Sequence, residues 1–175
     1  MVRGAWCVVL FGLAVGAGAP RALFAQEEEV GISVGAAAPA ITIRDLDGKP
    51  VDLARYIGKK PVLVEFWATW CPICKVLLPK MEAAQRRYGD RVEFLVVAVA
   101  VNESQNSVRR HLRQNPMPFK FLWDGDGAAV RAFQAPTTSY IVVLDANGKV
   151  AYTGVGEDQD VEAAVRKGIG DGKGR

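Results

Sequence analysis

Two cysteines stand two residues apart in the segment Cys71-Pro72-Ile73-Cys74. An apolar run ends just before this segment and apolar residues at helical spacing follow it, so Cys71 is predicted at the first turn of a helix. The unpaired backbone amides and the positive end of the helix dipole stabilise a thiolate there. Cys74 falls on the same face of that helix, near enough to resolve a mixed disulfide. The spacing therefore predicts thiol–disulfide exchange, with Cys71 as nucleophile and Cys74 as resolving thiol.

The rest of the sequence disfavours two structural roles for this pair. A small domain held together by disulfides carries four or more cysteines, whereas here only Cys7 stands outside the pair, within an apolar N-terminal run. Half of a zinc site would need a second Cys or His pair, and His111 is the one histidine of the chain. We therefore expect a reactive pair, no metal site and no bound cofactor.

Alternating strands and helices are predicted around the cysteines. Val62 to Trp67 is a near-continuous apolar run, typical of a buried central strand, and a helix is predicted over 72–88. The order of the elements predicts an α/β fold, with a mixed central sheet and helices on both faces. The other predicted elements are a hairpin over 41–53, strands over 92–101 and 120–123, helices over 105–115, 128–133 and 158–169, and a hairpin over 139–155.

The first 25 residues have the order of an export signal. Arg3 precedes an uncharged apolar run from Ala5 to Ala19, and Ala25 is a small residue just before a cluster of acids. The run is short for a transmembrane helix, and an uncleaved membrane anchor is the alternative. We expect a signal peptide or anchor over 1–25, a linker over 26–38, one domain over 39–169 and a disordered tail over 170–175. The domain would then be exported, to the periplasm or another extracytoplasmic space.

The charge balance points to no nucleic-acid partner. The net charge is +3 over 175 residues. It falls to about +1 when the first 25 residues, with two arginines and no acid, are removed. Nothing in that balance favours nucleic acid or an anionic membrane surface.

The segment from Val64 to Lys75, together with Pro79, resembles the active-site segment of the thioredoxin superfamily. The upstream turn Asp45-Leu46-Asp47-Gly48-Lys49 and the later Pro136-Thr137-Thr138 resemble its exported TlpA/ResA-like branch in particular. This resemblance implies a thioredoxin-like fold with an extra N-terminal hairpin and a central insertion. It also implies partners, which are the thiols or disulfides of exported proteins and a membrane or periplasmic electron donor.

The same resemblance implies the substrate-binding residues. Pro136 would be the cis-proline that faces the cysteine pair. A cis bond after Ala135 would expose the backbone groups of Ala135 to an extended substrate strand. Trp70, with Pro72 and Ile73 between the cysteines, would belong to the surface that meets the substrate.

One acid, Glu65, interrupts the apolar strand six residues before Cys71. A carboxyl desolvated there has a raised pKa and can take the proton from Cys74. By resemblance, cytosolic-type thioredoxins hold a buried acid at this position, which TlpA-like chains often lack. ResA-like chains instead carry an acid three residues after the second cysteine, where this chain has Leu77. The alternative is a glutamate satisfied by a buried partner, with no part in catalysis.

The residues between the cysteines bear on the direction of electron flow. Pro72 and Ile73 offer neither a side-chain hydrogen-bond donor nor a charge to a Cys71 thiolate, which favours a reductant. The sequence thus predicts an enzyme, a thiol–disulfide oxidoreductase that reduces exported proteins. The alternative is a metal-binding or assembly-factor module of the same fold without redox turnover.

Overall fold

The computed structural model describes Met1 and residues 30–170. The rest of the predicted export segment, and residues 171–175 of the predicted tail, lie outside the described residues. The described chain forms a seven-stranded sheet with the strand order β2-β1-β5-β4-β3-β6-β7. The elements are β1 (Thr42–Asp45), β2 (Pro50–Asp52), η1 (Leu53–Arg55), β3 (Val62–Trp67), α1 (Pro72–Tyr88), β4 (Glu93–Val99), α2 (Gln105–Gln114), β5 (Lys120–Asp124), α3 (Ala128–Ala132), β6 (Tyr140–Leu144), β7 (Val150–Gly154) and α4 (Val161–Ile169).

Strand β3, which leads to the cysteines, lies inside the sheet between β4 and β6. It is parallel to β4, with Trp67 beside Ala98, and antiparallel to β6, with Phe66 beside Tyr140. All of its residues are buried, as its apolar run predicts. Because β3 and β4 are parallel, the loops that follow them leave the sheet at the same edge. One of these loops leads to Cys71.

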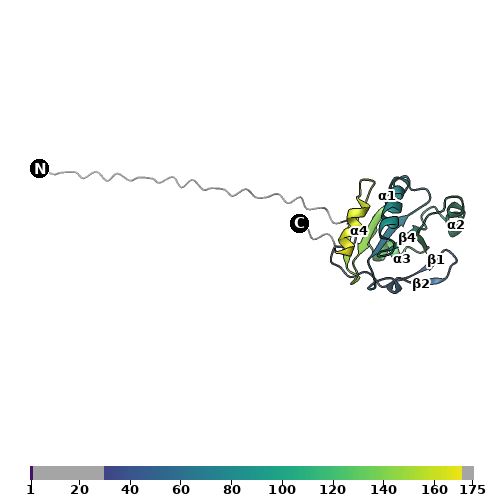
Figure 1. Ribbon diagram of the computed structural model, residues 1–175, viewed down its shortest axis with the longest axis horizontal. Coiled ribbons are helices and arrows are strands. Elements are labelled where there is room, and N and C mark those ends of the chain that lie inside the picture. The colour runs from purple at the N-terminus through teal and green to yellow at the C-terminus, as the bar shows by residue number, and fades with distance from the viewer. Residues whose placement is uncertain (2–29, 171–175) are drawn as a thin grey trace.

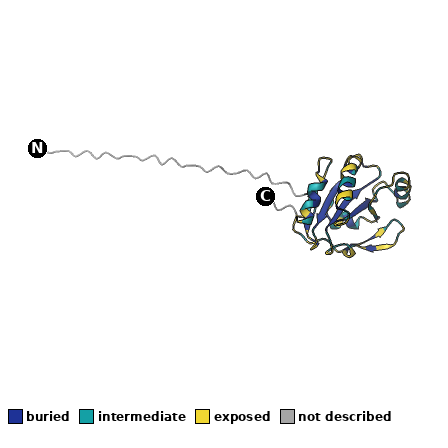
Figure 2. Ribbon diagram, viewed as in Figure 1, coloured by how far each residue is buried: buried dark blue, intermediate teal, exposed yellow. Residues whose placement is uncertain are grey.

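Helices cover both faces of the sheet (Figure 1). Helices α1 and α4 pack together on one face, and α2, α3 and η1 contribute to the core on the other. In Figure 2 the central strands of the sheet form the dark blue, buried centre of the domain. The core between the sheet and helices α1 and α4 includes Leu63, Leu77, Met81, Ile141, Val143 and Val165. The core on the opposite face includes Leu53, Val64, Phe66, Val108, Ala129 and Phe133.

The predicted α/β, thioredoxin-like fold is confirmed. Helix α1 covers the predicted residues, 72–88, and β1 and β2 form the predicted N-terminal hairpin. The hairpin turn is stabilised by the Asp45 side chain, whose Oδ1 accepts hydrogen bonds from the N–H groups of Asp47 and Lys49, both at 2.9 Å. Within residues 30–170, no helix is long and apolar enough to cross a membrane.

Residues 31–38, predicted as part of a linker, pack against the sheet instead. The N–H of Gly35 donates to the carbonyl oxygen of Val150 at 2.7 Å. Ile32 is only 7% exposed, and its N–H donates to the Tyr140 hydroxyl at 3.1 Å. The sequence concealed this packing because the segment is held largely through its backbone and has no apolar periodicity. The folded domain therefore begins several residues before the predicted boundary.

Candidate active site

Cys71 is the residue at which helix α1 begins. Its backbone is extended, with φ −75° and ψ 110°, and its Sγ accepts a hydrogen bond from the Cys74 N–H at 3.1 Å. Pro72 fits the first helical position because the N–H that a proline lacks would have no partner within the helix. The sulfur thus lies at the positive end of a 17-residue helix, as the sequence predicted.

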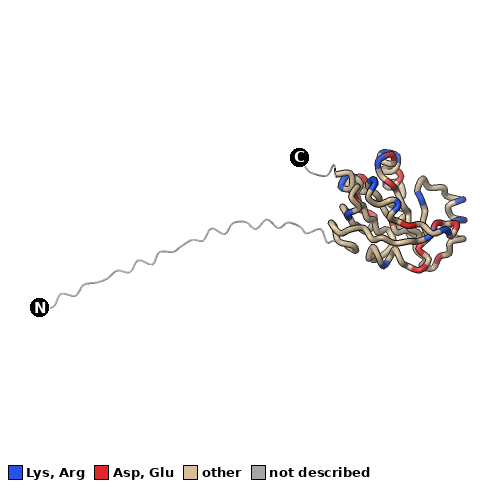
Figure 3. The backbone as a smooth tube through the Cα atoms, turned by 90° about the horizontal axis from the view of Figure 1, so that it is seen from below, with Lys and Arg blue, Asp and Glu red and all other residues tan. Residues whose placement is uncertain are grey.

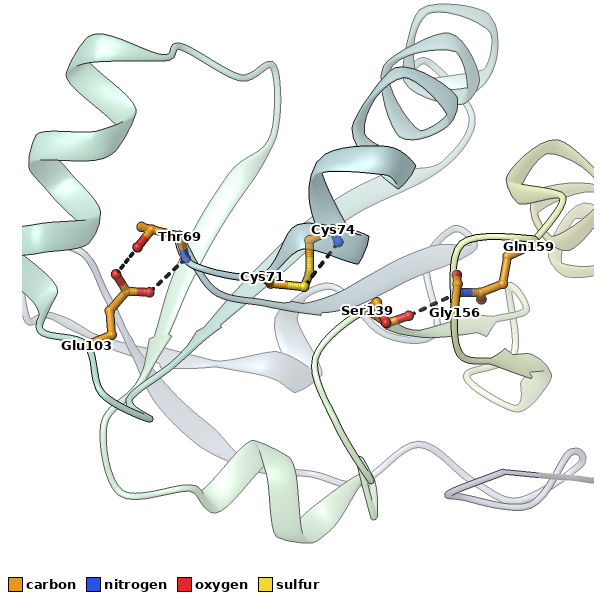
Figure 4. The surroundings of a disulfide bond; sticks show 7 residues. All are labelled: Thr69, Cys71, Cys74, Glu103, Ser139, Gly156 and Gln159. Atoms are coloured by element: carbon orange, nitrogen blue, oxygen red, sulfur yellow. Dashed lines mark hydrogen bonds between the residues drawn. A yellow bond between two sulfur atoms is a disulfide. The ribbon is translucent and has the colours of Figure 1, made fainter.

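Cys71 and Cys74 are joined by a disulfide (Figure 4), with their Cα atoms 5.3 Å apart. The two residues are 2% and 1% exposed, whereas Pro72 and Ile73 between them are exposed. The described structure is therefore the oxidised form of the pair, with both cysteines shielded and the residues between them facing outward.

Apolar side chains surround this helix start. Trp70 is 45% exposed, Ile73 37% and Val76 49%. The indole Nε1 of Trp70 donates to the carbonyl oxygen of Val101 at 2.8 Å, which ties the loop before Cys71 to the loop after β4. Trp67, in contrast, is 5% exposed and belongs to the core. Trp70 and Ile73 are therefore exposed next to the disulfide.

A second contact holds the loop before Cys71 in place, and Figure 4 shows it. The carboxylate of Glu103 accepts two hydrogen bonds from Thr69, one from the backbone N–H at 2.9 Å and one from Oγ1 at 2.5 Å. Glu103 directly precedes Ser104, whose side chain caps helix α2. The active-site loop is thus anchored to the N-terminal end of α2.

Glu65 lies within β3, beside Val96 of β4 and Ile141 of β6. It is 3% exposed, and its Oε1 has no hydrogen-bond partner among the described residues. Burial raises the pKa of this carboxyl to about 8, so most of it is protonated at neutral pH. By the alternation of the strand its side chain shares a face with Leu63, which packs with α1, the helix that carries Cys74. The predicted burial of the carboxyl is confirmed, and the described residues do not supply the alternative buried partner to Oε1.

The predicted cis bond before Pro136 is wrong, because no peptide bond among the described residues is cis. Pro136 is exposed, and the N–H of Ala135 is already bonded to the carbonyl oxygen of Val130 at 2.9 Å. The chain instead joins β3 at Ser139, whose N–H donates to the carbonyl oxygen of Phe66 at 2.7 Å. A proline could not make that bond, since it has no N–H.

Comparison with known proteins identifies the family to which the chain belongs. The model of the family described as Redoxin matches residues 33–167. The chain belongs to the Redoxin family. It is 34% identical over 134 residues to the thioredoxin-like protein YneN of Bacillus subtilis (strain 168), covering 75% of this chain and 76% of that protein. It is 28% identical over 157 residues to the thiol-disulfide oxidoreductase ResA of Bacillus cereus (strain ATCC 10987 / NRS 248), covering 88% of each chain.

A solved structure agrees with these relatives. The putative thiol:disulfide interchange protein DsbE of Chlorobium tepidum superposes with a TM-score of 0.68 at 26% identity, covering 82% of this chain and 99% of that one. This redoxin is therefore a member of the ResA-like branch of the thioredoxin superfamily, as its motifs indicated. It is a thiol–disulfide oxidoreductase.

Sequence reasoning missed three residues of the redoxin site. Glu103 precedes the predicted helix over 105–115, and its contact with Thr69 spans 34 positions of the sequence. Ser139 is fully buried, with φ 63°, and its carbonyl oxygen accepts a hydrogen bond from Nε2 of Gln159 at 3.0 Å. Gln159 falls within the helix predicted over 158–169, but it precedes α4 and is only 7% exposed. The one signal in the sequence was spacing, because Pro136 stands three residues too early to be the residue that enters β6.

The described residues, Met1 and 30–170, hold no cluster of metal ligands. Nowhere in this part of the chain do three or more His, Cys, Asp or Glu side chains gather in a way that could hold a metal ion. His111 instead lies against the Trp67 ring, with 5.6 Å between ring centroids.

Proposed function

We propose that this protein reduces disulfide bonds in exported proteins through the Cys71–Cys74 pair. The observation that carries the proposal is the position of the Cys71 sulfur at the start of α1, where a thiolate is stabilised and ready to attack. In the reduced protein, Cys71 attacks a substrate disulfide and forms a mixed disulfide. Cys74 then attacks Cys71, releases the reduced substrate and leaves the oxidised pair, which a donor dithiol must reduce again.

The surroundings of the pair support a polypeptide substrate. Several of the exposed large apolar side chains of the described domain lie on or next to the segments that flank the disulfide. Apolar surface of this kind suits contact with another protein chain. No comparable cluster of one charge sign stands out, since basic and acidic residues are interspersed along the described chain (Figure 3). The apolar residues are Trp70, Ile73, Val76 and Val101.

A reducing role is supported by the scarcity of side chains that add to the effect of the helix start and stabilise the Cys71 thiolate further. In the described part of the chain, the one hydrogen bond to the Cys71 sulfur comes from the Cys74 N–H. The exposed side chains of Pro72 and Ile73 add neither charge nor donor. A thiolate that lacks such additional side-chain stabilisation leaves the reduced form less stable and the couple more reducing. Export is supported by the composition of residues 1–25, and the electron donor would then be a membrane or periplasmic protein.

The reduction potential of the pair tests this proposal. The domain without the export segment is equilibrated with glutathione buffers, and the oxidised fraction is measured by thiol labelling. We expect a potential nearer thioredoxin's value of about −270 mV than the value of about −120 mV found for a strong oxidant. A value above about −150 mV would contradict the reducing role. Failure of the pair to exchange at all, or to reduce insulin in the presence of dithiothreitol, would contradict the proposal as a whole.

A further inference from the structure

Ser139 occupies the place beside the disulfide that the sequence assigned to a proline. It is drawn among the surroundings of the Cys71–Cys74 bond in Figure 4, on the segment that leads into β6. Its N–H donates a hydrogen bond to the carbonyl oxygen of Phe66 near the end of β3, and its carbonyl oxygen accepts one from Nε2 of Gln159. Both backbone groups are therefore used within the domain, and the residue is held firmly at this position.

The hydroxyl of Ser139, in contrast, has no hydrogen-bond partner among the described residues. The residue is 0% exposed, and Oγ makes no hydrogen bond to any described residue. The one other buried side-chain oxygen in this condition within residues 30–170 is Oε1 of Glu65. Buried hydroxyl groups in native proteins are nearly always hydrogen-bonded, because leaving one unpaired is unfavourable. A partner that exists in only one redox state of the protein would account for the unpaired donor in the oxidised form.

Reduction of the disulfide creates such a partner. We propose that the Ser139 hydroxyl donates a hydrogen bond to the Cys71 thiolate in the reduced protein and so favours the reduced form. Ser139 is then a positioning residue, since it acts through Cys71. This inference rests on the proposed redox function, because it requires the pair to open and close.

The bonds and electrons of that step balance as follows. A dithiol such as dithiothreitol supplies two electrons and two protons and becomes a cyclic disulfide. The Cys71–Cys74 bond breaks, Cys74 takes up one proton as a thiol, and Cys71 remains a thiolate while the second proton goes to solvent. The thiolate is the new acceptor, and a hydroxyl is a suitable donor to it. Cys71 should consequently have a lower pKa with the hydroxyl than without it.

Two variants separate the hydroxyl from the backbone. Ser139→Ala removes the hydroxyl and keeps a Cβ at φ 63°, whereas Ser139→Gly removes the hydroxyl and tolerates this φ freely. The Cys71 pKa is measured from the pH dependence of alkylation by iodoacetamide, which needs no turnover. The measurements are made in a Glu65→Gln background, so that ionisation of the Glu65 carboxyl, whose pKa is about 8, does not overlap with that of the Cys71 thiol. They are then repeated with Glu65 present. Glu103, which accepts a hydrogen bond from the Thr69 N–H, is not mutated in any of these proteins.

We expect both variants to raise the Cys71 pKa by about one unit, a tenfold change. The equilibrium with glutathione should shift about tenfold toward the disulfide, which is about 30 mV. Thermal unfolding should show Ser139→Ala destabilised relative to wild type in the reduced form only. A shift of this size leaves the couple within the reducing range proposed above.

Three results would overturn the inference. One is an unchanged Cys71 pKa and potential in both variants. Another is an equal loss of stability in both redox forms, which would make Ser139 a packing residue. The third is a change in the titration of Glu65 without any change at Cys71, which would make Glu65 the partner of the hydroxyl. Absence of exchange in the wild-type protein would instead contradict the proposed function, while the alkylation experiment would still report on Ser139.

Discussion

At the scale of single residues, Glu65 combines burial with a missing partner. Its carboxyl lies in an otherwise apolar strand, with a pKa raised to about 8 by burial. A neutral carboxyl cannot take a proton, but at neutral pH a minor fraction is ionised and is a stronger base than an ordinary glutamate. That is the condition in which it could accept the proton of Cys74, whose thiol must become a thiolate to resolve the mixed disulfide.

The first prediction concerns this proton transfer. Glu65→Gln should leave the first attack by Cys71 nearly unchanged and slow resolution by Cys74 by roughly ten- to a thousandfold, the typical range for a positioned general base. Stopped-flow measurement of the build-up and decay of the mixed disulfide at neutral pH separates the two steps. Glu157→Gln is the matched control, because Glu157 is exposed and its hydrogen bond to Lys80 uses the backbone carbonyl oxygen. Equal decay rates in wild type and Glu65→Gln would make Glu65 a structural residue.

The second prediction follows from the same carboxyl and concerns stability. Its pKa is 4.5 in an ordinary setting and about 8 in the folded protein, so the folded state binds the proton more tightly. Between these values the unfolded state has lost the proton and the folded state has kept it. Unfolding free energy should therefore fall as pH rises, by about 1.4 kcal/mol per pH unit. Urea unfolding of the oxidised protein from about pH 5 to about pH 8 should show this slope in wild type relative to Glu65→Gln. Parallel curves for the two proteins would contradict the raised pKa.

At the scale of the elements, the sequence predicted best where side chains decide the structure. The apolar run of β3 and the helical spacing after Pro72 predicted the strand and the whole of α1. It predicted least well where the backbone decides. Residues 31–38 are small and bind largely through peptide groups, and the place beside the disulfide depends on which residue β6 brings next to Phe66. Neither arrangement produces a recognisable side-chain pattern in the sequence. The Pro136-Thr137-Thr138 motif therefore suggested that Pro136 lies beside the disulfide, whereas the pairing of β6 with β3 brings Ser139 there.

The third prediction concerns the link between the active-site loop and α2. Glu103→Ala removes the acceptor of two hydrogen bonds from Thr69. The site is partly buried, so we expect a loss of about 1–2 kcal/mol in unfolding free energy and faster amide exchange at Thr69. Asn106→Ala, an exposed position in the first turn of α2, should change the exchange at Thr69 little. Unaltered protection of the Thr69 amide in Glu103→Ala would show that the Trp70 contact holds the loop by itself.

At the scale of the whole molecule, the fit of α4 against the sheet depends on a glycine. A Cβ on Gly168 would come within 2.5 Å of Cγ1 of Val143 and 3.3 Å of the carbonyl oxygen of Leu144. The helix and β6 therefore approach each other more closely than any larger residue would allow. The same helix packs against α1, so this approach sets the spacing of the layer above the active-site strand.

The fourth prediction follows from this close approach. Gly168→Ala should lower the unfolding free energy by about 1–2 kcal/mol, although alanine favours a helix more than glycine does, because the added methyl group overpacks the contact. Chemical denaturation measures the change. In a double-mutant cycle, Val143→Ala should relieve part of the loss by removing the atom that the new Cβ would meet. A gain in stability for Gly168→Ala alone would show that the two elements separate without cost.

The packing of residues 31–38 has a consequence for aggregation. Strand β7 is an outer strand of the sheet, and its first residue, Val150, makes two backbone hydrogen bonds with this segment. The Gly35 N–H donates to the Val150 carbonyl oxygen, and the Val150 N–H donates to the Ala36 carbonyl oxygen. Uncovered outer strands recruit strands from other molecules. A shortened protein that starts at residue 39 should therefore self-associate more than one that starts at residue 30, which light scattering at increasing concentration would reveal. Residues 31–38 thus cover part of an outer strand that would otherwise be open to pairing with another molecule. Equal scattering from the two proteins would show that β7 does not need this cover.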